Sequence, residues 1–424
     1  MALRRTGRIF YGWWIVAVGF GLEVLIGILL FHIYGAYVVL FQREFGWSKT
    51  MLSAAFALAR AESGMLGPVQ GWLTDHFGPR ALIQVGMAIF GIGYVLLSQV
   101  SSAVTFFLAF FVIALGASLG GYLPTGVALV NWFRRRRAMA LAITGTGMPV
   151  GGFLTPLVVS ALERFGWRWT AFASGLVILA AGIPMGSVVR HRPEPYAEWP
   201  DGEPPAAPAA PGPSRGASAA VDFTAREALR TQAFWLISLG HGSALLVVST
   251  VMVHMLAHVT ERLGYSLQQG AQVVALATGV QVVAQLVGGG WAGDRFSKRG
   301  LVVACMVAHA FSLLLLAFAT SFWMVAAFGV LHGIAWGVRG PLMSAIRADY
   351  FGSAAFGTIS GFSSVIVMMG MMAGPLVAGI LADRTGSYRP GFVVLAGLAA
   401  LGSVCFWLAK RPLPPYAREP RSRG

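Results

Sequence analysis

Long apolar runs separated by short polar segments dominate the chain. Each run has about the length of helix, roughly 20 residues, that crosses the hydrocarbon core of a bilayer. The first six predicted helices span residues 11–41, 50–75, 81–99, 104–132, 138–162 and 167–189. The other six span residues 232–260, 267–294, 300–319, 322–348, 354–381 and 388–409. Ser48 and Ser266 stand where N-caps are expected, just before the second and eighth runs. The predicted fold class is therefore an all-α integral membrane protein with twelve transmembrane helices.

The composition also indicates that lipid surrounds most of the chain. Hydrophobic residues make up 56% of it and charged residues only 11%, against about a quarter charged in soluble globular proteins. The two cysteines, Cys305 and Cys405, both lie in apolar runs, so neither a disulfide framework nor a cysteine metal site is expected. The formal charge of +15 would suit nucleic acid. The Lys and Arg residues cluster between the apolar runs, however, which is typical of membrane topology, and no nucleic-acid partner is expected.

The distribution of basic residues predicts the orientation. With the N-terminus in the cytoplasm, the inner segments carry 22 Lys and Arg residues, Arg347 among them, and the outer segments carry 7. The positive-inside rule then predicts that both termini are cytoplasmic. The basic start leads into an apolar run that is too long for a signal peptide and has no cleavage site after it. We expect a multi-pass protein of a cell membrane, namely a bacterial inner membrane.

One polar stretch is long, at residues 190–231, and separates the two groups of six helices. Its middle, PDGEPPAAPAAPGPSRGASAA, buries too little apolar surface to fold and is predicted to be a flexible linker. Thr224 and Glu227 have capping-box spacing, which predicts a short helix on the inner membrane surface with Arg226 and Arg230 near lipid headgroups. The predicted organisation is an N-terminal bundle (1–189), a cytoplasmic linker with this short helix (190–231), a C-terminal bundle (232–410) and a cytoplasmic tail (411–424).

The two groups of helices are predicted to be repeats. Four landmarks recur 218 or 219 residues further on: Gly46-Trp47-Ser48 as Gly264-Tyr265-Ser266, GWLTDHFGPR (71–80) as GWAGDRFSKR (290–299), Asn131-Trp132-Phe133 as Asp349-Tyr350-Phe351, and Pro156 as Pro375. An even number of spans in each half makes the repeats parallel. This is the geometry of transporters whose two halves rock around a site near the bilayer midplane.

These motifs resemble the major facilitator superfamily over essentially the full length of the chain. The resemblance is carried by GWLTDHFGPR and its repeat. Two further segments, YGWWIVAVGF (11–20) and NWFRRRRAMALAITGTGMPVGG (131–152), resemble the bacterial relatives of the monocarboxylate porters. The resemblance implies a secondary transporter that works by alternating access. The animal porters resemble one another in an Asp/Arg pair in the eighth span and a Lys in the first. This chain has Gln281 and Gln285 in its eighth span and no Lys in its first, where His32 with Tyr34 is the candidate replacement.

Four full charges lie near the middle of predicted spans, at Glu23, Arg60, Glu62 and Arg339, and they sum to zero. Ionisable groups inside lipid are costly, so they usually face a cavity or a partner and mark function. Arg60 and Glu62 are two residues apart on one helix, point to roughly opposite sides and are not expected to pair directly. Each is expected to face another helix or water.

Arg339 is the principal candidate for substrate binding. It precedes Asp349 by ten residues, which places it about 15 Å from the inner end of its helix. His332 and Trp336 lie on the same helical face. A buried guanidinium presents a planar fork of donors that suits a carboxylate, so Arg339 is predicted to anchor a small organic anion. The alternative is a structural ion pair with one of the embedded glutamates. The full set of predicted substrate contacts is Arg339, Trp336, His332, Gln281, Gln285, Tyr34, His32 and Arg60.

Glu23 and Glu62 are the candidates for proton coupling. A substrate that competes for a neighbouring arginine would favour protonation of the carboxylate that the arginine had stabilised. Protons are therefore the expected coupling ion. The alternative is that these glutamates are permanently paired.

Asp75 and Asp294 are predicted to form gates, because they end the second and eighth spans on the inner side. A carboxylate there can face the positive N-terminal end of a helix from the opposite half. Arg80 and Arg295 are the candidates to complete each latch. The alternative is that these charges only mark the topology.

The predicted function is thus a proton-coupled carrier of a small organic anion, a monocarboxylate by resemblance. Two alternatives within transport are an exporter or exchanger of larger amphipathic compounds, for which the 28 Phe and 13 Trp residues are suited, and a carrier of a neutral nutrient. A transport-derived membrane sensor is the alternative of another class. No nucleophile–base arrangement, cofactor motif or soluble catalytic domain is recognisable, so neither an enzyme nor a cofactor is predicted. No metal site is predicted, because no histidine pair has ligand spacing with a supporting carboxylate.

Overall fold

The computed structural model describes residues 10–202, 223–352 and 355–413, and all of its regular elements in these ranges are helical. The helices of the N-terminal half are α1 (Gly12–Ile26), α2 (Tyr34–Phe45), α3 (Lys49–Ser98), α4 (Ala103–Gly120), α5 (Tyr122–Trp132), α6 (Arg137–Gly145), α7 (Gly147–Phe153), α8 (Thr155–Val177) and α9 (Ile183–Val188). Two π-helical segments, Gly27–His32 and Ile178–Gly182, connect α1 to α2 and α8 to α9. Two 3₁₀ turns follow, at Glu194–Tyr196 and Pro200–Gly202.

The helices of the C-terminal half follow the same pattern. They are α10 (Ala225–Leu229), α11 (Gln232–Leu263), α12 (Leu267–Ala284), α13 (Gly293–Arg295), α14 (Lys298–Ala317), α15 (Phe322–Phe351), α16 (Phe356–Thr385) and α17 (Arg389–Leu408). A π-helical segment, Gln285–Ala292, connects α12 to α13. Its first residue is one of the two glutamines predicted to contact substrate.

Two glycines divide helical runs that would otherwise be too long for one membrane crossing. Gly78 in α3 has φ 80° and ψ 155°, and Gly166 in α8 has φ 78° and ψ 162°. Residues with a Cβ avoid this region, whereas glycine enters it at little cost. Each glycine therefore lets the chain turn back sharply between two spans.

The described helices account for the twelve predicted spans. Ten helical stretches are long and apolar enough to cross a membrane. One of them, Met139–Val188, contains the break at Gly166 and so holds two spans, the fifth and the sixth. The part of α3 before Gly78 supplies the second span, which is not among the ten stretches. The all-α, twelve-span prediction is confirmed, with helix ends close to those expected from the apolar runs.

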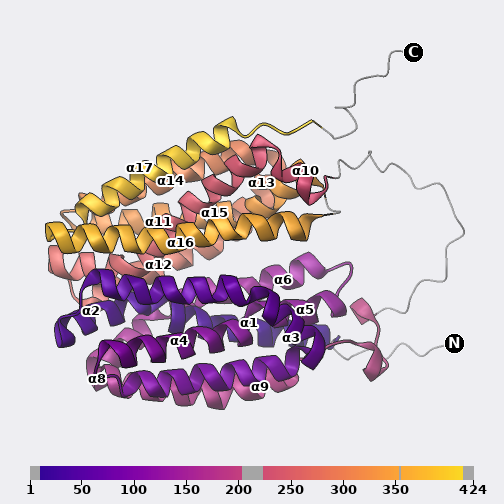
Figure 1. Ribbon diagram of the computed structural model, residues 1–424, viewed down its shortest axis with the longest axis horizontal. Helices are drawn as coiled ribbons and strands as arrows, with labels where there is room; N and C mark the ends of the chain where they lie inside the picture. Colours follow the sequence, from indigo (N-terminus) through magenta and orange to yellow (C-terminus); the bar gives the residue numbers. More distant parts are fainter. Residues whose placement is uncertain (1–9, 203–222, 353–354, 414–424) are drawn as a thin grey trace, which may run out of the picture. The chain divides into compact units, whose positions relative to one another are not determined.

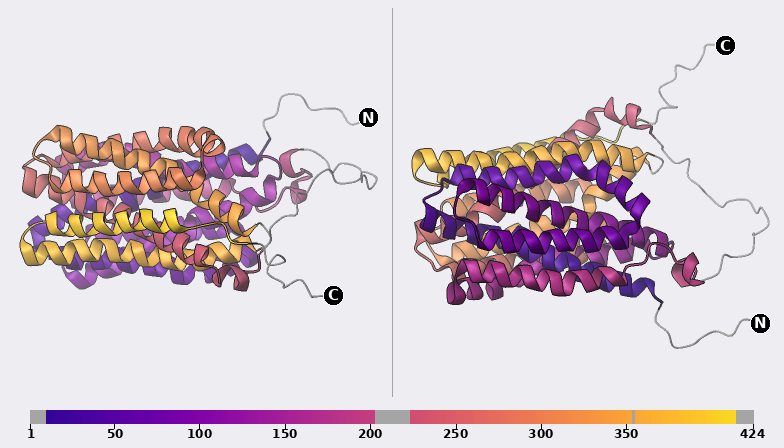
Figure 2. Two further views of the ribbon diagram at one scale, coloured as in Figure 1. Left: turned by 90° about the horizontal axis from the view of Figure 1, so that it is seen from above. Right: turned by 60° about the horizontal axis from the view of Figure 1, so that its bottom comes forward.

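The described chain forms two compact units. Unit 1 contains residues 10–33 and 65–202, and unit 2 contains residues 34–64, 223–352 and 355–413. Within each unit the long helices run alongside one another (Figures 1 and 2). The most extensive packing in unit 2 joins α11 to α16 and α14 to both α15 and α17.

Residues 34–64 belong to the first and second spans in sequence, yet they pack with helices of the C-terminal half. Ser53 Oγ and the backbone carbonyl of Pro375 in α16 both lie 2.9 Å from His254 Nε2 in α11. The carboxylate of Asp383 in α16 accepts hydrogen bonds from the backbone N–H groups of Lys49 (3.1 Å) and Thr50 (2.8 Å) at the start of α3. These bonds join α3 directly to the C-terminal helices.

Equivalent positions of the two repeats make equivalent contacts, each within its own unit. Trp132 Nε1 donates a hydrogen bond of 2.9 Å to the carbonyl of Arg190. Tyr350, the counterpart of Trp132, donates through its hydroxyl to the carbonyl of Ala409 at 2.8 Å. The two acceptors are themselves 219 residues apart, the offset found between the sequence landmarks. The spatial contacts therefore support the duplication.

The predicted helix caps are present. Ser48 Oγ accepts from the N–H of Met51, and Ser266 forms a capping box with Gln269. Thr224 and Glu227 form the predicted capping box at the start of the short helix α10. Its placement on a membrane surface stays a prediction.

Most of the predicted flexible linker, residues 203–222, lies outside the described residues. Its first residues are held in place, which was not expected. Asp201 accepts hydrogen bonds from the backbone N–H groups of Arg134 (3.0 Å) and Arg135 (2.8 Å). The Arg190 guanidinium lies between the rings of Tyr11 and Tyr196, 3.8 and 3.9 Å from their centroids.

Candidate functional site

One stripe of α15 carries two buried arginines and a buried histidine of unit 2. His332, Trp336, Arg339 and Arg347 follow one another at intervals of four, three and eight residues, which keeps them on one face of the helix. The structure therefore brings together His332, Trp336 and Arg339, as predicted, and adds Arg347. We call these four residues, with His241, His309 and Ser363 around them, the α15 cluster.

The side chain of Arg339 is buried within unit 2. Its side chain is only 1% exposed, and two of its guanidinium nitrogens, Nε and Nη1, have no hydrogen-bond partner. The ionisable groups close enough to interact with it electrostatically are Cys305, Arg347 and the three histidines of the cluster. None of these is an acid that would be ionised at neutral pH.

Arg347 is the second cation of the cluster and is 8% exposed. Its Nη2 donates to Nδ1 of His241 in α11 at 2.9 Å and to Oγ of Ser363 in α16 at 2.8 Å. Ser238 in α11 donates to the same Ser363 oxygen at 2.9 Å. Nε of Arg347 has no partner. The guanidinium is thus held in position by neutral groups, with donor capacity left over.

Aromatic rings surround His332, the first residue of the stripe. The His332 ring stacks on Phe328, with 5.4 Å between centroids, and meets His309 of α14 edge-on at 5.1 Å. It also contacts Trp336, at 5.9 Å. Neither ring nitrogen of His309 or His332 has a hydrogen-bond partner. Among the described residues, no cluster of three His, Cys, Asp or Glu side chains could hold a metal ion.

The described side chains supply no counter-charge to the α15 cluster. Among these side chains, neither Arg339 nor Arg347 forms an ion pair or hydrogen bond with an Asp or Glu. A buried charge without a partner costs several kcal/mol of stability even after the protein relaxes around it. The arrangement is therefore able to bind an anion, which would relieve that cost.

Gln281 and Gln285 lie on α12 and the π-helical segment that follows it. Gln281 is 5% exposed and its Oε1 has no partner. The backbones of α12 and α15 approach closely where Gly337 meets the Gln281 carbonyl. The two helices are thus neighbours, although no described contact joins either glutamine side chain to Arg339.

Tyr34 and His32 both interact with backbone groups. The Tyr34 hydroxyl donates to the Leu52 carbonyl at 2.6 Å within unit 2. His32 belongs to unit 1, is 4% exposed and interacts with the backbone of Met148. These contacts are those of packed structural side chains.

Arg60 and Glu62 lie in the part of α3 that belongs to unit 2. The Arg60 guanidinium lies over the Phe56 ring, 5.3 Å from its centroid. Glu62 is 5% exposed, and neither of its carboxylate oxygens has a hydrogen-bond partner. The two side chains do not hydrogen-bond to each other, in agreement with their spacing.

Glu23 is a buried acid of unit 1. It is 7% exposed, lies beside Gly147 of α7 and interacts electrostatically with Tyr122 of α5. No described residue forms an ion pair with it. The side chains of Asp75 and Asp294, two of the predicted gating residues, lie outside the described side chains, whereas Arg80 and Arg295 are exposed. The predicted gates stay predictions.

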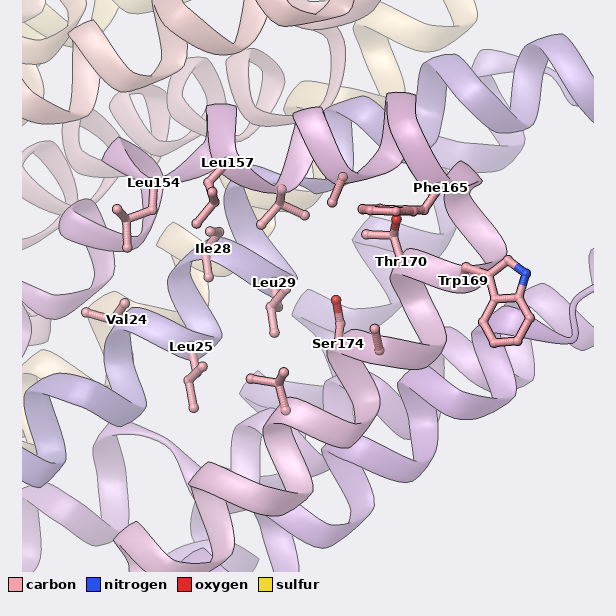
Figure 3. Close-up of a pocket in the computed structure, with 14 residues that line it drawn as sticks. Val24, Leu25, Ile28, Leu29, Leu154, Leu157, Phe165, Trp169, Thr170 and Ser174 are labelled. Atoms are coloured by element: carbon pink, nitrogen blue, oxygen red, sulfur yellow. The ribbon is translucent and has the colours of Figure 1, made fainter.

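An open cavity of about 780 Å³ lies at the surface of unit 1 (Figure 3). It is lined by residues of the first, fifth and sixth spans, including Leu25, Leu157 and Trp169, and its polar lining is limited to small hydroxyl residues such as Ser174. It therefore suits an apolar body and offers no charge to an anion.

The sequence pattern does not single out Arg347, His241 or His309. Arg347 was counted with the inner basic segments because it lies near the end of its apolar run, whereas α15 continues to Phe351 and buries it. The available signal was its spacing of eight residues from Arg339, which keeps both on one helical face. His241 and Ser363 come from distant parts of the chain, and no spacing rule connects them.

Comparison with known proteins defines the class of this chain. The profile of the Major Facilitator Superfamily matches residues 14–291 and 237–424. The chain therefore belongs to the Major Facilitator Superfamily. Its fold is also that of a solved bacterial homologue of the human lysosomal transporter Spinster, crystallised in an inward-facing and occupied conformation, with a TM-score of 0.71 at 15% identity over 96% of this chain and 98% of that one.

Sequence relatives include members of the monocarboxylate transporter group. Human monocarboxylate transporter 11 is 28% identical over 95% of this chain and 84% of its own length. Monocarboxylate transporter 4 of Gallus gallus is 24% identical over 96% of this chain and 86% of its own. A protein of Cupriavidus necator described as a probable sulfoacetate transporter is 27% identical over 86% of each chain. The predicted resemblance to monocarboxylate porters is confirmed.

Proposed function

We propose that this transporter carries a small organic anion by alternating access and that Arg339 binds the anionic group. The observation that supports this most directly is the buried guanidinium of Arg339, which has no acidic partner among the described residues. The names of the relatives, monocarboxylate and sulfoacetate transporters, point to the same substrate class. The alternative, a structural ion pair of Arg339, is not seen among the described residues of unit 2.

The site is less stable when it is empty than when an anion occupies it. A cation removed from water needs a counter-charge or several hydrogen bonds to offset its lost hydration. A carboxylate that accepts two parallel hydrogen bonds from a guanidinium supplies both. Substrate binding would therefore be favoured by relief of a cost that the protein bears when the site is empty.

Access to Arg339 requires helix movement, because the side chain is 1% exposed in this conformation. Pro341 lies inside α15, two residues beyond Arg339. It provides no N–H for the helix and so weakens α15 next to the arginine. We propose that α15 opens there when the transporter changes state, which exposes the guanidinium to the aqueous side.

Glu23 and Glu62 are our candidates for proton coupling. Both are buried, and neither forms an ion pair or hydrogen bond with a described residue. A carboxyl group in an apolar site is more stable when protonated. Loading a proton together with an anion would also reduce the charge that moves across the membrane.

We also propose that both termini lie in the cytoplasm, because the distribution of the Lys and Arg residues favours this orientation.

The test is uptake of radiolabelled anions into proteoliposomes. We expect Arg339→Gln to lower uptake by about 30-fold or more, because removing one partner of a buried charged contact costs at least 2 kcal/mol. Arg384→Gln is the matched control, since it removes an arginine that is exposed at the end of α16. The variant must elute from size-exclusion chromatography as the wild type does. Full uptake by Arg339→Gln would show that this residue is not the anchor.

The coupling proposal is tested separately in the same vesicles. An inward proton gradient should stimulate uptake by the wild type, and Glu23→Gln or Glu62→Gln should remove that stimulation without removing exchange of substrate at equal pH. Uptake that ignores the gradient would refute coupling and leave the anion proposal unaffected.

The cavity in unit 1 favours a second candidate function, transport of larger amphipathic compounds. Leu157 is 70% exposed and lines this cavity, so Leu157→Trp would reduce its volume. If the anion proposal is right, this variant should take up anions as the wild type does. Loss of uptake of an amphipathic substrate in Leu157→Trp, together with normal uptake in Arg339→Gln, would favour the second candidate.

A further inference from the structure

We propose that the substrate carries two negative charges and that Arg339 and Arg347 each bind one of its acidic groups. This inference rests on the proposed function and extends it from an anion to a dianion. It follows from the pair of buried guanidiniums on one stripe of α15, for which the described part of unit 2 supplies no counter-charge.

The two guanidiniums are close enough to act on one molecule. Their Cα atoms are separated by about 12 Å along the helix axis, from eight residues at 1.5 Å each, and their long side chains shorten or lengthen that span. The two groups repel each other electrostatically. One monoanion would neutralise a single guanidinium and leave the other unpaired, whereas a dianion between them would neutralise both.

The surroundings of Arg347 resemble a prepared binding position. Arginine can only donate hydrogen bonds, so Nδ1 of His241 must be the acceptor and carries no proton. Ser363 likewise accepts from Arg347, and Ser238 donates to Ser363. Three neutral side chains therefore fix the guanidinium without neutralising it. Nε of Arg347 remains without a partner for an incoming oxygen.

A structural role alone does not explain why both cations are retained in this place. A salt bridge would fix α15 to its neighbours with a carboxylate, and a hydrogen-bonded neutral residue would do so without the cost of a buried charge. The cluster has neither a carboxylate nor exposure to water that would hydrate the charges. A substrate that brings two negative charges accounts for both observations.

The experiment compares each dianion with a monoanion of nearly the same size and shape. The probes are oxalate, malonate, succinate and glutarate, each paired with its monoamide. Binding to the purified full-length protein in detergent is measured by isothermal titration calorimetry at neutral pH, where both carboxyl groups of each diacid are ionised or largely so. We expect at least one diacid to bind tenfold or more tightly than its monoamide.

Arg347→Gln then identifies which side chain recognises the second charge. In this variant the best diacid should lose its advantage and bind about as tightly as its monoamide, while the monoamide keeps its wild-type affinity. Arg339→Gln should weaken both ligands. Arg384→Gln, the exposed control, should change neither. Arg347→Lys, which keeps the charge but not the fork of donors, should lose only part of the diacid advantage.

The outcomes separate this inference from the function on which it rests. If monoamides bind as tightly as their diacids to the wild-type protein, the dianion inference is wrong and the anion proposal stands. Equal weakening of both ligands in Arg347→Gln would also overturn it, because the residue would then act on the site as a whole. If neither the diacids nor the monoamides bind, both proposals fail. The comparison of ligands on the wild type does not depend on any variant folding.

Discussion

Unit 2 contains two groups of charged residues that differ in how their charges are balanced. The first is the α15 cluster, where two buried arginines face neutral side chains. The second, which we call the Lys49 cluster, lies at the start of α3 and the ends of α11 and α16. There Lys49 pairs with Glu261 at 2.7 Å, and Asp383 accepts hydrogen bonds from two backbone N–H groups and the Thr50 hydroxyl.

The difference separates charges that stabilise the fold from charges for which we propose a ligand as the partner. Every charge in the Lys49 cluster has a partner and is partly exposed, so the cluster adds modest stability to the packing of α3 on α11 and α16. The α15 cluster is expected to cost stability, because both of its cations are desolvated and no described side chain pairs them with an acid. Substitutions in the two clusters should therefore change thermal stability in opposite directions.

The largest effect is expected for Arg339→Met in the absence of substrate. Replacing a buried charge with an apolar side chain of similar volume is stabilising by about 1–4 kcal/mol in favourable cases. The melting temperature of the purified variant, followed by tryptophan fluorescence in detergent, should rise, while anion binding is lost. A lower melting temperature would mean that Arg339 already has a stabilising partner.

Asp383→Ala should lower the melting temperature, whereas Arg339→Met should raise it. The substitution removes the acceptor that caps the first backbone N–H groups of α3, and loss of such a cap costs about 1 kcal/mol. The melting temperature should fall. It should fall less in Asp383→Asn, because the amide oxygen of asparagine can still accept a hydrogen bond from these N–H groups. An unchanged melting temperature in Asp383→Ala would show that the Lys49 cluster does not stabilise the packing of α3.

Lys49→Gln should have a smaller effect than Asp383→Ala. The Lys49–Glu261 pair is partly exposed, with 13% and 35% of the two side chains accessible, and pairs of this kind contribute about 0–1 kcal/mol. The difference between wild type and variant should shrink further in 1 M salt, where charges are screened. A large difference that persists in high salt would point instead to the contact of Lys49 with the Tyr388 ring.

The smallest expected effect on stability is that of Asp201 in unit 1, whose carboxylate, like that of Asp383, accepts hydrogen bonds from backbone N–H groups. Burial alone would raise the pKa of Asp201, but hydrogen bonds from the N–H groups of Arg134 to Arg136 outweigh it and lower the pKa below its usual value. Its contribution to stability is therefore present above the unfolded-state pKa of about 4 and is lost as the pH falls through the lower folded-state value. The wild type should lose slightly more stability than Asp201→Asn between pH 5 and pH 3. Identical pH profiles would show that this contact contributes nothing.

The fold was predictable because lipid imposes a simple rule on the sequence. A spanning helix must satisfy its own backbone and be apolar along its length, so the apolar runs mark the helices directly. The caps at Ser48 and Ser266 follow from local chemistry. The packing of residues 34–64 with C-terminal helices was not predictable, because it depends on contacts between residues far apart in sequence, such as Ser53 with His254 (201 residues apart) and Thr50 with Asp383 (333 residues apart).

The candidate site was predictable only in part. The placement of Arg339, His332 and Trp336 on one face of a helix was predictable, because a charge in an apolar run is conspicuous and helical spacing identifies its neighbours; their role stays a prediction. The Tyr34 hydroxyl donates to a backbone carbonyl and His32 interacts with the backbone of Met148, contacts that no spacing rule predicts, and the proposed substrate role of both residues stays a prediction. The net charge around Arg339 could not be predicted from sequence. The four embedded charges sum to zero along the chain, whereas the α15 cluster contains two arginines, Arg339 and Arg347.

The membership of residues 34–64 in unit 2 has a consequence for biosynthesis. These residues leave the ribosome early, but Asp383 of α16, which bonds to Lys49 and Thr50, is translated more than 300 residues later. The first two spans must therefore enter the bilayer and remain incompletely packed until nearly the whole chain has been made. Truncation before α16 would leave this early segment without its partners, and membrane quality-control proteases should recognise such a fragment even though its own sequence is intact.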